Sequence, residues 1–402
     1  MSRSSSVQAV LWAELAPTRP PYHCTMKPPR LAQLDCYQVS LPVRRGSYTM
    51  SGGRVLTTFD TVVVRVTAED GTTGFGESCT LGQNYIEAFP AGVQATIHAL
   101  APTVLSCDVL APDVLVREMD RAVLGHLAGK SAVDVALWDL RGKLLGQPVA
   151  TLLGGVHQAG FPAFHPITLD EPERMAEEAA AIRATGYRCW QLKLGDSPRT
   201  DARRLESVLD AVGEASDFVT SDPNAAWTVA QACEFLQAIA GLRTFVEQTC
   251  PTLRQMREVR ERSPWPVTVD EAIRDVADLV ECLRLGAADA VNIKITRVGG
   301  ITRAARLRDL AQAAGLMLMV DEPMGSHLAT AAIAQVAASS RPESFLAASH
   351  IGAHSARSLL RAGEPALVEG RITWPEGPGL GVEVEEQALG DSVFTVRRRD
   401  LT

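Results

Sequence analysis

The middle of the chain contains four short apolar runs, FVTSD (218–222), TFVEQ (244–248), VTVDE (267–271) and VNIKI (291–295). Each run has a charged residue at or next to its end, namely Asp222, Glu247, Asp270 and Lys294, and successive charged residues are 25, 23 and 24 positions apart. This interval fits one strand, one helix and two short loops, and the carboxyl ends of parallel strands face one mouth. The spacing therefore predicts that three carboxylates and a lysine converge.

Asp222, Glu247 and Asp270 would offer oxygen ligands from three strands. Such ligands suit a hard divalent cation, Mg²⁺ with Mn²⁺ as a substitute, whereas zinc prefers nitrogen or sulfur. Any one of these acids alone could equally be a solvated strand end, because isolated acids are common on protein surfaces. Three acids in phase with a lysine favour the metal site.

The composition excludes several classes of protein. The chain has 402 residues, 46% hydrophobic and 21% charged, which is ordinary for a globular protein of one large or two smaller domains. Its net charge of −8 is spread along the chain without a basic block, so we expect no nucleic-acid partner and no membrane surface. No apolar run approaches the roughly 18 residues needed to span a bilayer.

The eight cysteines are scattered singly, which is typical of buried thiols in a reducing cytoplasm. Residues 1–25 contain several prolines and no periodic apolar pattern, so we expect a disordered extension.

Two patterns divide the rest of the chain. Between residues 26 and 158, alternating runs such as FDTVVVRVTAEDG (59–71) precede helical periodicity such as KSAVDVALWDLRGKLLG (130–146), which predicts an α+β domain. Residues 159–354 instead alternate short apolar runs with amphipathic segments, the pattern of parallel βα units. We expect a (β/α)7β TIM-type barrel there, and residues 355–402 to pack back on the α+β domain, which caps the barrel.

The chain resembles the mandelate racemase and muconate lactonizing enzyme branch of the enolase superfamily. The resemblance is carried by WDLRGKLLGQPVATLLGG (138–155), SDPNAAW (221–227), FVEQTCP (245–251), VDEA (269–272) and KITRVGG (294–300). It implies that Asp222, Glu247 and Asp270 are Mg²⁺ ligands, and that Lys193 and Lys294 are acid/base residues on the second and sixth strands. A lysine that serves as base must lose its proton near neutral pH, and we expect a neighbouring cation to lower its pKa.

Within that family the closer likeness is to the cis-3-hydroxy-L-proline dehydratases, in GSYTMSGGRVLTTFDTVVVRV (46–66), MDRAVLGHLAGKSAVDVALWDL (119–140) and QLKLG (191–195). In the last of these, Gln191 stands where the family commonly has a first lysine. The resemblance implies that residues 44–54 and 78–85 form a lid over the substrate. Tyr48 and Tyr85 lie in these segments and would either shape specificity or serve in packing.

The resemblance implies a hydro-lyase that removes the proton α to a carboxylate and then eliminates water, converting cis-3-hydroxy-L-proline to Δ1-pyrroline-2-carboxylate. A racemase or epimerase of proline-like or N-acyl amino acids would use the same two lysines, and a non-catalytic binding barrel is a further alternative. We expect a small-molecule carboxylate substrate and a homo-oligomer.

Five further residues lie at or just beyond predicted strand ends: Asn224, Glu271, Asp321, Glu322 and His350. Asn224 would either support a metal ligand or serve as a turn residue. Asp321 or Glu322 would contact the ring nitrogen, and only one of these neighbours can face the mouth. His350 is a candidate wall residue of the substrate site. Glu271 should point away from Asp270 by strand alternation, so a structural role is expected for it.

Overall fold

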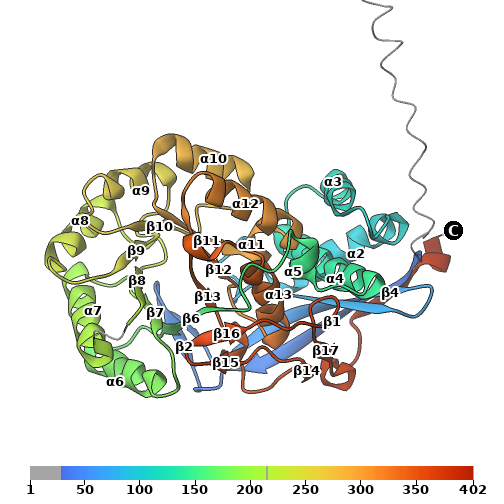
Figure 1. The fold of residues 1–402 in the computed structure, drawn as a ribbon, viewed down its shortest axis with the longest axis horizontal. Coiled ribbons are helices and arrows are strands. Elements are labelled where there is room, and N and C mark those ends of the chain that lie inside the picture. The colour runs from blue at the N-terminus through green and yellow to red at the C-terminus, as the bar shows by residue number, and fades with distance from the viewer. Residues whose placement is uncertain (1–28, 214–215, 402) are drawn as a thin grey trace, which may run out of the picture.

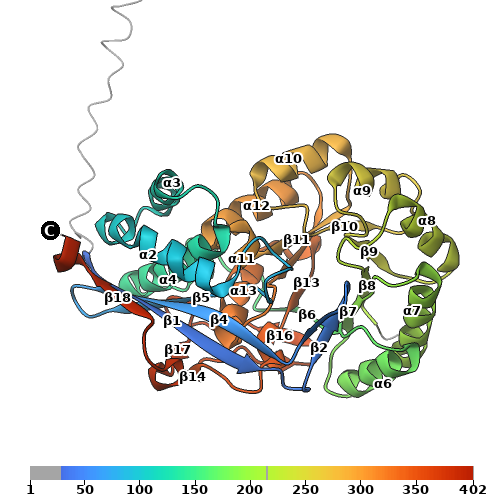
Figure 2. The same cartoon turned by 180° about the vertical axis from the view of Figure 1, so that it is seen from behind.

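The computed structural model describes residues 29–213 and 216–401, and the expectation for residues 1–25 lies outside them. The described chain forms a barrel with a smaller α+β unit packed beside it (Figure 1 and Figure 2). No helix in this part of the chain is long and apolar enough to cross a membrane.

The barrel is a closed ring of parallel strands, in which β13 pairs with both β12 and β6. Its strands are β6 (Gly160–Ile167), β7 (Cys189–Lys193), β8 (Phe218–Asp222), β9 (Phe245–Glu247), β10 (Val267–Val269), β11 (Ala290–Lys294), β12 (Met317–Asp321) and β13 (Phe345–Ser349). The connecting helices are α6 (Pro172–Arg183), α7 (Pro198–Val212), α8 (Val229–Ala238), α9 (Leu253–Arg260), α10 (Val276–Leu285), α12 (Ile301–Ala313) and α13 (His327–Ala338), with a short α11 (Ile295–Val298). The predicted (β/α)7β barrel is confirmed.

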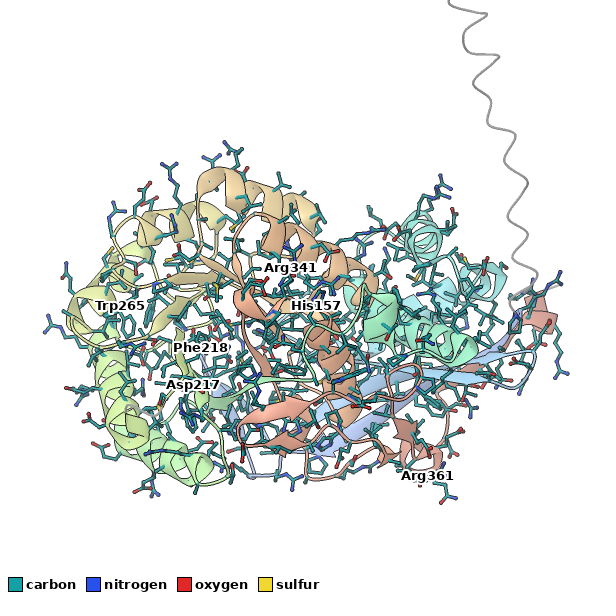
Figure 3. All side chains as sticks on the ribbon, in the orientation of Figure 1. His157, Asp217, Phe218, Trp265, Arg341 and Arg361 are labelled. Atoms are coloured by element: carbon teal, nitrogen blue, oxygen red, sulfur yellow. The ribbon has the colours of Figure 1, made fainter. Side chains whose placement is uncertain are left out.

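Local sequence explains where these elements begin and which faces they bury. Strands such as β11 are buried at every residue, because helices cover the outside and side chains fill the inside (Figure 3). α9 shows the helical pattern, with Met256 and Val259 buried and Arg257 facing outward. A capping box, formed by Thr252 and Gln255, starts this helix.

The capping unit is a four-stranded sheet in the order β18-β1-β4-β5, whose neighbours pair antiparallel. Its elements are β1 (Leu31–Pro42), β4 (Thr58–Ala68), β5 (Thr73–Cys79), β18 (Phe394–Arg397), α2 (Pro90–Ser106), α3 (Pro112–Ala122), α4 (Leu127–Leu145) and α5 (Val149–Leu152). The backbone of α4 crosses β5 so closely that a Cβ atom at Gly74 or Gly76 would lie within about 2.3 Å of it. Glycine at these two positions therefore permits the helix to pack on the sheet.

The C-terminal segment returns to both units. β18 extends the capping sheet beside β1, and β16 (Arg371–Thr373) pairs antiparallel with β6 of the barrel. In the same segment, β14 (Leu360–Ala362) pairs with β17 (Glu383–Val384), and β15 (Leu367–Val368) pairs with β16. The predicted capping domain of N-terminal and C-terminal segments is thus present.

A buried carboxylate joins the two units. Glu77 on β5 accepts hydrogen bonds from the backbone N–H of Ser326 (2.8 Å), the Ser326 hydroxyl (2.6 Å) and the backbone N–H of Ala329 (3.0 Å). These donors lie at the start of α13, where backbone N–H groups have no partner within the helix and favour negative charge. The capping unit therefore supplies a carboxylate acceptor to the N-terminus of a barrel helix, beside the N-cap residue Ser326.

Replacing Glu77 with Ala should lower the free energy of unfolding by about 3 kcal/mol, because it leaves buried donors without an acceptor. Urea denaturation measures the effect, and Glu69→Ala, at an exposed position at the end of β4, is the control. Equal stability of the two variants would contradict a joining role for Glu77.

Candidate active site

Five adjacent strands bring the predicted catalytic and metal-binding residues together. Lys193 ends β7, Asp222 ends β8, Glu247 ends β9, Asp270 follows β10 and Lys294 ends β11. All five side chains are buried, and the three acids are 0% exposed. These five groups therefore share the mouth of the barrel: four are the regularly spaced strand-end residues, and the fifth, Lys193, is the residue that the family resemblance indicated.

Each lysine is paired with one of these acids. The Lys193 ammonium lies 2.5 Å from an Asp222 oxygen. Asp222 also accepts hydrogen bonds from the backbone N–H and the side-chain amide of Asn224, at 2.9 and 2.8 Å. Asn224 thus supports a predicted metal ligand.

Lys294 is ion-paired with Asp270 and lies 3.3 Å from Asp321. A second cation, Arg297, contacts Asp270 and donates hydrogen bonds to the carbonyls of Ile273 (3.0 Å) and Asn292 (2.7 Å). Sequence reasoning missed Arg297. The available signal was its position three residues after Lys294, on the turn of helix that follows the strand.

Glu247 is held by neutral donors instead of a cation. Its oxygens accept hydrogen bonds from Gln191 (3.0 Å), Thr220 (3.3 Å) and Asn292 (2.8 Å). Each donor lies two positions before a charged strand end, so it points into the barrel one layer below. Alternation could have identified Thr220 and Asn292, which the sequence analysis did not single out.

The electrostatics of the site are set by crowding of buried charge. Burial, followed by the charges of Asp222 and Asp270, raises the pKa of Glu247 to about 8. Burial also raises the pKa of Asp270, but Arg297 and Lys294 outweigh it and bring the value to about 2. The site therefore contains more carboxyl groups than positively charged side chains.

Neighbouring groups raise the pKa values of both lysines. Burial lowers the pKa of Lys193, but Asp222, Tyr48 and Glu247 together raise it by more, and the result lies well above the ordinary value. The pKa of Lys294 is likewise raised, chiefly by Asp270 against the effect of burial. Both ammonium groups are stabilised here, because their nearest neighbours are carboxylates.

Glu271 and Glu322 do not follow strand alternation. β10 ends at Val269, so Glu271 turns back toward the site and accepts a hydrogen bond from the Asn224 amide at 3.0 Å. Its Oε2 atom is buried without a partner, and burial raises the pKa of Glu271 to about 7. The expectation that Glu271 faces away is wrong, because alternation ends with the strand.

Asp321 and Glu322 both line a small cavity next to Lys193 and Lys294, which is described below. The expectation that only one of them faces the mouth is therefore also wrong. β12 ends at Asp321, and Glu322 lies beyond it. Glu322 accepts hydrogen bonds from the backbone N–H and hydroxyl of Thr296, at 2.9 and 3.1 Å.

The donor set fits a hard divalent cation, although in the described residues no group of three or more His, Cys, Asp or Glu side chains stands in metal-binding geometry. Two of the acids, Asp222 and Asp270, direct oxygens to the lysines instead. All the predicted donors are oxygens. The described residues at this mouth include six buried or partly buried carboxyl groups, Asp222, Glu247, Asp270, Glu271, Asp321 and Glu322, and three buried cations, Lys193, Lys294 and Arg297. Added positive charge would relieve this imbalance.

A small cavity lies between the two lysines and the capping unit. Its volume is about 10 Å³, room for no more than a water molecule. It is lined by Tyr48, Met50, Leu81, Tyr85, Phe164, Pro166, Gln191, Lys193, Lys294, Asp321, Glu322, Pro323 and Ile351. Tyr48 lies on the hairpin of β2 (Tyr48–Met50) and β3 (Arg54–Leu56), and the Tyr85 ring centroid lies 5.7 Å from the Lys294 ammonium.

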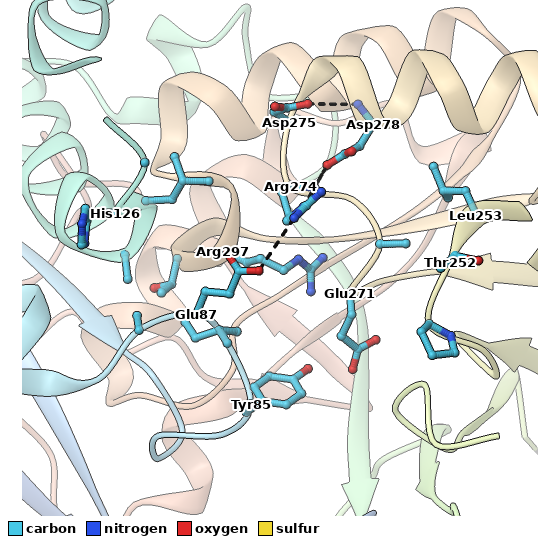
Figure 4. A pocket seen from close by; sticks show the side chains of 18 of the residues that line it. Tyr85, Glu87, His126, Thr252, Leu253, Glu271, Arg274, Asp275, Asp278 and Arg297 are labelled. Atoms are coloured by element: carbon cyan, nitrogen blue, oxygen red, sulfur yellow. Dashed lines mark hydrogen bonds and ion pairs between the residues drawn. The ribbon is translucent and has the colours of Figure 1, made fainter. Parts of the chain in front are cut away.

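A larger hollow, of about 1120 Å³, lies beside this cavity. Figure 4 shows Tyr85 and Glu271 on one side of it and Arg274 bridging Glu87 and Asp278 across it. The Arg274–Glu87 ion pair, at 3.8 Å, joins the capping segment to the loop after β10. Tyr85 lines both the larger hollow and the small cavity, so it lies between the larger hollow and the lysines.

His350 does not line the cavity but belongs to a buried group of imidazoles with His165, His327 and His354. The His165 and His354 rings stack at 4.7 Å, and the His327 and His350 rings meet edge-on at 5.7 Å. His350 contacts the Tyr187 hydroxyl and the carbonyl of Pro365, both at 3.2 Å. Its contacts are with the barrel wall and the C-terminal segment.

Fold and site together define a barrel enzyme with paired lysines beside buried carboxylates at the strand ends. Residues 174–388 match the enolase C-terminal domain-like family, and residues 37–154 match the mandelate racemase/muconate lactonizing enzyme N-terminal domain. The chain belongs to the mandelate racemase/muconate lactonizing enzyme family of the enolase superfamily, which confirms the resemblance and the prediction of an enzyme of this superfamily.

Named relatives carry more than one activity. The chain is 34% identical to a cis-3-hydroxy-L-proline dehydratase from Roseibium aggregatum, covering 90% of this chain and 99% of that one. It is 28% identical to an N-succinyl-L-Arg/Lys racemase from Bacillus cereus, covering 90% and 97%. A family structure from Roseovarius nubinhibens, complexed with magnesium, superposes with a TM-score of 0.88 at 31% identity, covering 91% and 100%.

The buried imidazoles should make the fold sensitive to acid. Burial, followed by Arg45 and His350, lowers the pKa of His165 to about 3, and burial followed by His327 lowers that of His350 to about 4. Below pH 6.5, the ordinary histidine pKa, these imidazoles are protonated in the unfolded chain but stay neutral in the folded chain. The free energy of unfolding should therefore fall by about 1.4 kcal/mol per pH unit for each such imidazole between about pH 6.5 and 4.

His165→Phe should flatten this slope, because it removes a group that takes up a proton mainly when the chain unfolds. The replacement breaks no hydrogen bond, since neither His165 ring nitrogen has a hydrogen-bond partner. Urea denaturation at pH 7, 6 and 5 measures the slope, with the exposed His157→Phe as control. Identical slopes in the wild type and His165→Phe would show that His165 does not contribute.

Proposed function

We propose that this chain is a divalent-cation-dependent dehydratase that converts cis-3-hydroxy-L-proline to Δ1-pyrroline-2-carboxylate. The observation that carries the proposal is that Lys193 from β7 and Lys294 from β11 enter one enclosed cavity, each beside a buried carboxylate. The 34% identity to a cis-3-hydroxy-L-proline dehydratase over nearly the whole of both chains supports the choice of substrate.

The stereochemistry of this substrate suits two proton carriers. Its hydroxyl and carboxylate share one face of the ring, so the α-hydrogen lies on the face opposite the hydroxyl. One lysine would take the α-proton while the other donates a proton to the hydroxyl, which leaves as water. The C–H and C–O bonds break and a C=C bond forms, which gives an enamine. The enamine then gains a proton at carbon and loses one from nitrogen, and so becomes the cyclic imine.

Asp222, Glu247 and Asp270 would hold the cation, Mg²⁺ or Mn²⁺. When bound, the cation would stabilise the negative charge that develops on the substrate carboxylate as the α-proton leaves. Lys193 and Lys294 can accept a proton near neutral pH only when the charge of Asp222 and Asp270 is taken up by another group, because these carboxylates raise the lysine pKa values.

The enclosure favours a compact substrate. Tyr48 and Tyr85 close the cavity from the capping side, and almost no free volume remains between them and the lysines. A five-membered ring therefore requires less displacement of the walls than an N-acyl amino acid with a long side chain. Asp321 would supply negative charge for the ring ammonium. Burial raises the pKa of Glu322 well above its ordinary value, so this side chain would act as a hydrogen-bond acceptor for the ring nitrogen.

A racemase or epimerase of proline-like or N-acyl amino acids is the second candidate. The two lysines could remove and return the α-proton on opposite faces without a leaving group, and the 28% identity to an N-succinyl-L-Arg/Lys racemase supports this reading. Incubation with hydroxyproline stereoisomers and with proline separates the candidates. A dehydratase releases the imine from cis-3-hydroxy-L-proline, whereas an epimerase exchanges the α-proton and forms the other isomer.

Alanine at Asp222, Glu247 or Asp270 should abolish cation-dependent turnover, because each removes an oxygen ligand from the proposed cation site. Imine formation with Mg²⁺ after chelation and readdition measures turnover, and calorimetric titration measures cation binding. Glu173→Ala, at an exposed position in the first turn of α6, is the control. A folded Glu247→Ala variant with wild-type turnover would remove Glu247 from the site.

Lys193→Ala and Lys294→Ala should each reduce dehydration by at least about 10²-fold, because a positioned proton carrier contributes about 10²–10⁴-fold. In deuterated solvent, the variant that retains the base should still exchange the α-proton without losing water, and the variant that lacks it should do neither. Near wild-type dehydration by both variants would exclude the two-lysine mechanism.

A further inference from the structure

Gln248, the residue after Glu247, has an unusual backbone and a fully buried side chain. Its φ angle is +30°, in the left-handed region that residues other than glycine seldom adopt, and its exposed fraction is 0%. It does not line the substrate cavity. A buried, strained residue beside a catalytic centre requires a structural explanation.

The explanation lies in how Gln248 ends the parallel ladder between β9 and β10. Its backbone N–H donates to the carbonyl of Thr268 at 2.9 Å, as a regular parallel ladder requires. In a regular ladder its own carbonyl would then accept from the backbone N–H of Asp270. Instead, the carbonyl accepts from the backbone N–H of Ala225 at 2.7 Å, on the loop after β8.

The Gln248 side chain replaces the missing ladder bond. Its Oε1 atom accepts from the backbone N–H of Asp270 at 2.6 Å and from that of Ala272 at 3.2 Å. Its Nε2 atom donates to the carbonyl of Cys250 at 2.9 Å, which fixes the orientation of the amide. One residue therefore joins the ends of three adjacent strands, and each of these strands presents one acid.

We propose that Gln248 is a positioning residue that sets the separation of Asp222, Glu247 and Asp270 and thereby the affinity of the site for a divalent cation. The main-chain carbonyl of Gln248 holds the loop that follows Asp222, and its side-chain amide holds the backbone of Asp270. This inference rests on the proposed function only in assigning a cation to the three acids.

The chain contains a matched control. Gln335 on α13 is equally buried, and its Oε1 atom accepts from the backbone N–H of Ala150 at 2.8 Å. Its Nε2 atom donates to the carbonyls of Pro375 and Leu380, both at 3.0 Å. Gln335 thus makes the same kinds of bonds but joins α13 to α5 and the C-terminal segment, none of which carries a proposed cation ligand.

The test compares Gln248→Met with Gln335→Met, since methionine keeps the side-chain volume and removes the amide. Mg²⁺ affinity is measured by calorimetric titration of the substrate-free protein, and hydrogen exchange is followed in the peptide covering residues 266–274. Gln248→Met should weaken Mg²⁺ binding about ten- to a hundredfold, the range usual for groups that orient metal ligands. It should also speed exchange in that peptide. Gln335→Met should lower the melting temperature but leave both readouts unchanged.

Should Gln248→Met fail to fold, Gln248→Gly tests the same point, because glycine adopts the positive φ without strain yet also lacks the acceptor. Wild-type Mg²⁺ affinity in a folded Gln248 variant would overturn the positioning role while leaving the proposed reaction intact. Equal loss of affinity in the Gln248 and Gln335 variants would reduce the effect to general destabilisation and would also overturn it. Absence of Mg²⁺ binding in the wild type would overturn both the role and the proposed cation site.

Discussion

Pairing of buried charge at the carboxyl ends of β7 to β11 is the constraint on which the rest of the site depends. An isolated carboxylate or ammonium in a barrel interior would cost several kcal/mol, so each must find a partner. Lys193 pairs with Asp222, and Lys294 pairs with Asp270. Glu247 accepts hydrogen bonds from the neutral donors Gln191, Thr220 and Asn292, and burial raises its pKa.

The capping unit helps to bury these charge pairs. The hairpin that carries Tyr48 is fixed to the barrel, because Thr49 bonds to Thr168 and Leu169 through its backbone. Glu77 fixes the capping sheet to α13 from another side. The lysines are therefore held away from water by residues from a separate part of the chain, which strengthens every electrostatic interaction in the cavity.

Local pattern was sufficient for the barrel and for four of the charged residues at its mouth. Strand length, helical periodicity and a repeat of 23 to 25 residues are properties of neighbouring positions, and they place Asp222, Glu247, Asp270 and Lys294 on one rim, whereas Lys193 was indicated by the family resemblance. The errors lie where regular structure stops. Glu271 and Glu322 follow the last residues of β10 and β12, so alternation no longer predicts where they point.

The sequence by itself determined the order of elements and the chemical character of the site, because hydrophobic period and residue type are written in neighbouring positions. Only the tertiary structure decided how the groups pair. Arg297 reaches Asp270, and Gln248 connects loops that are distant in the sequence, because barrel closure brings these strand ends side by side. His350 lies with other imidazoles on the barrel wall for the same reason. Such contacts depend on backbone angles and on packing between distant segments, neither of which leaves a periodic signal in the sequence.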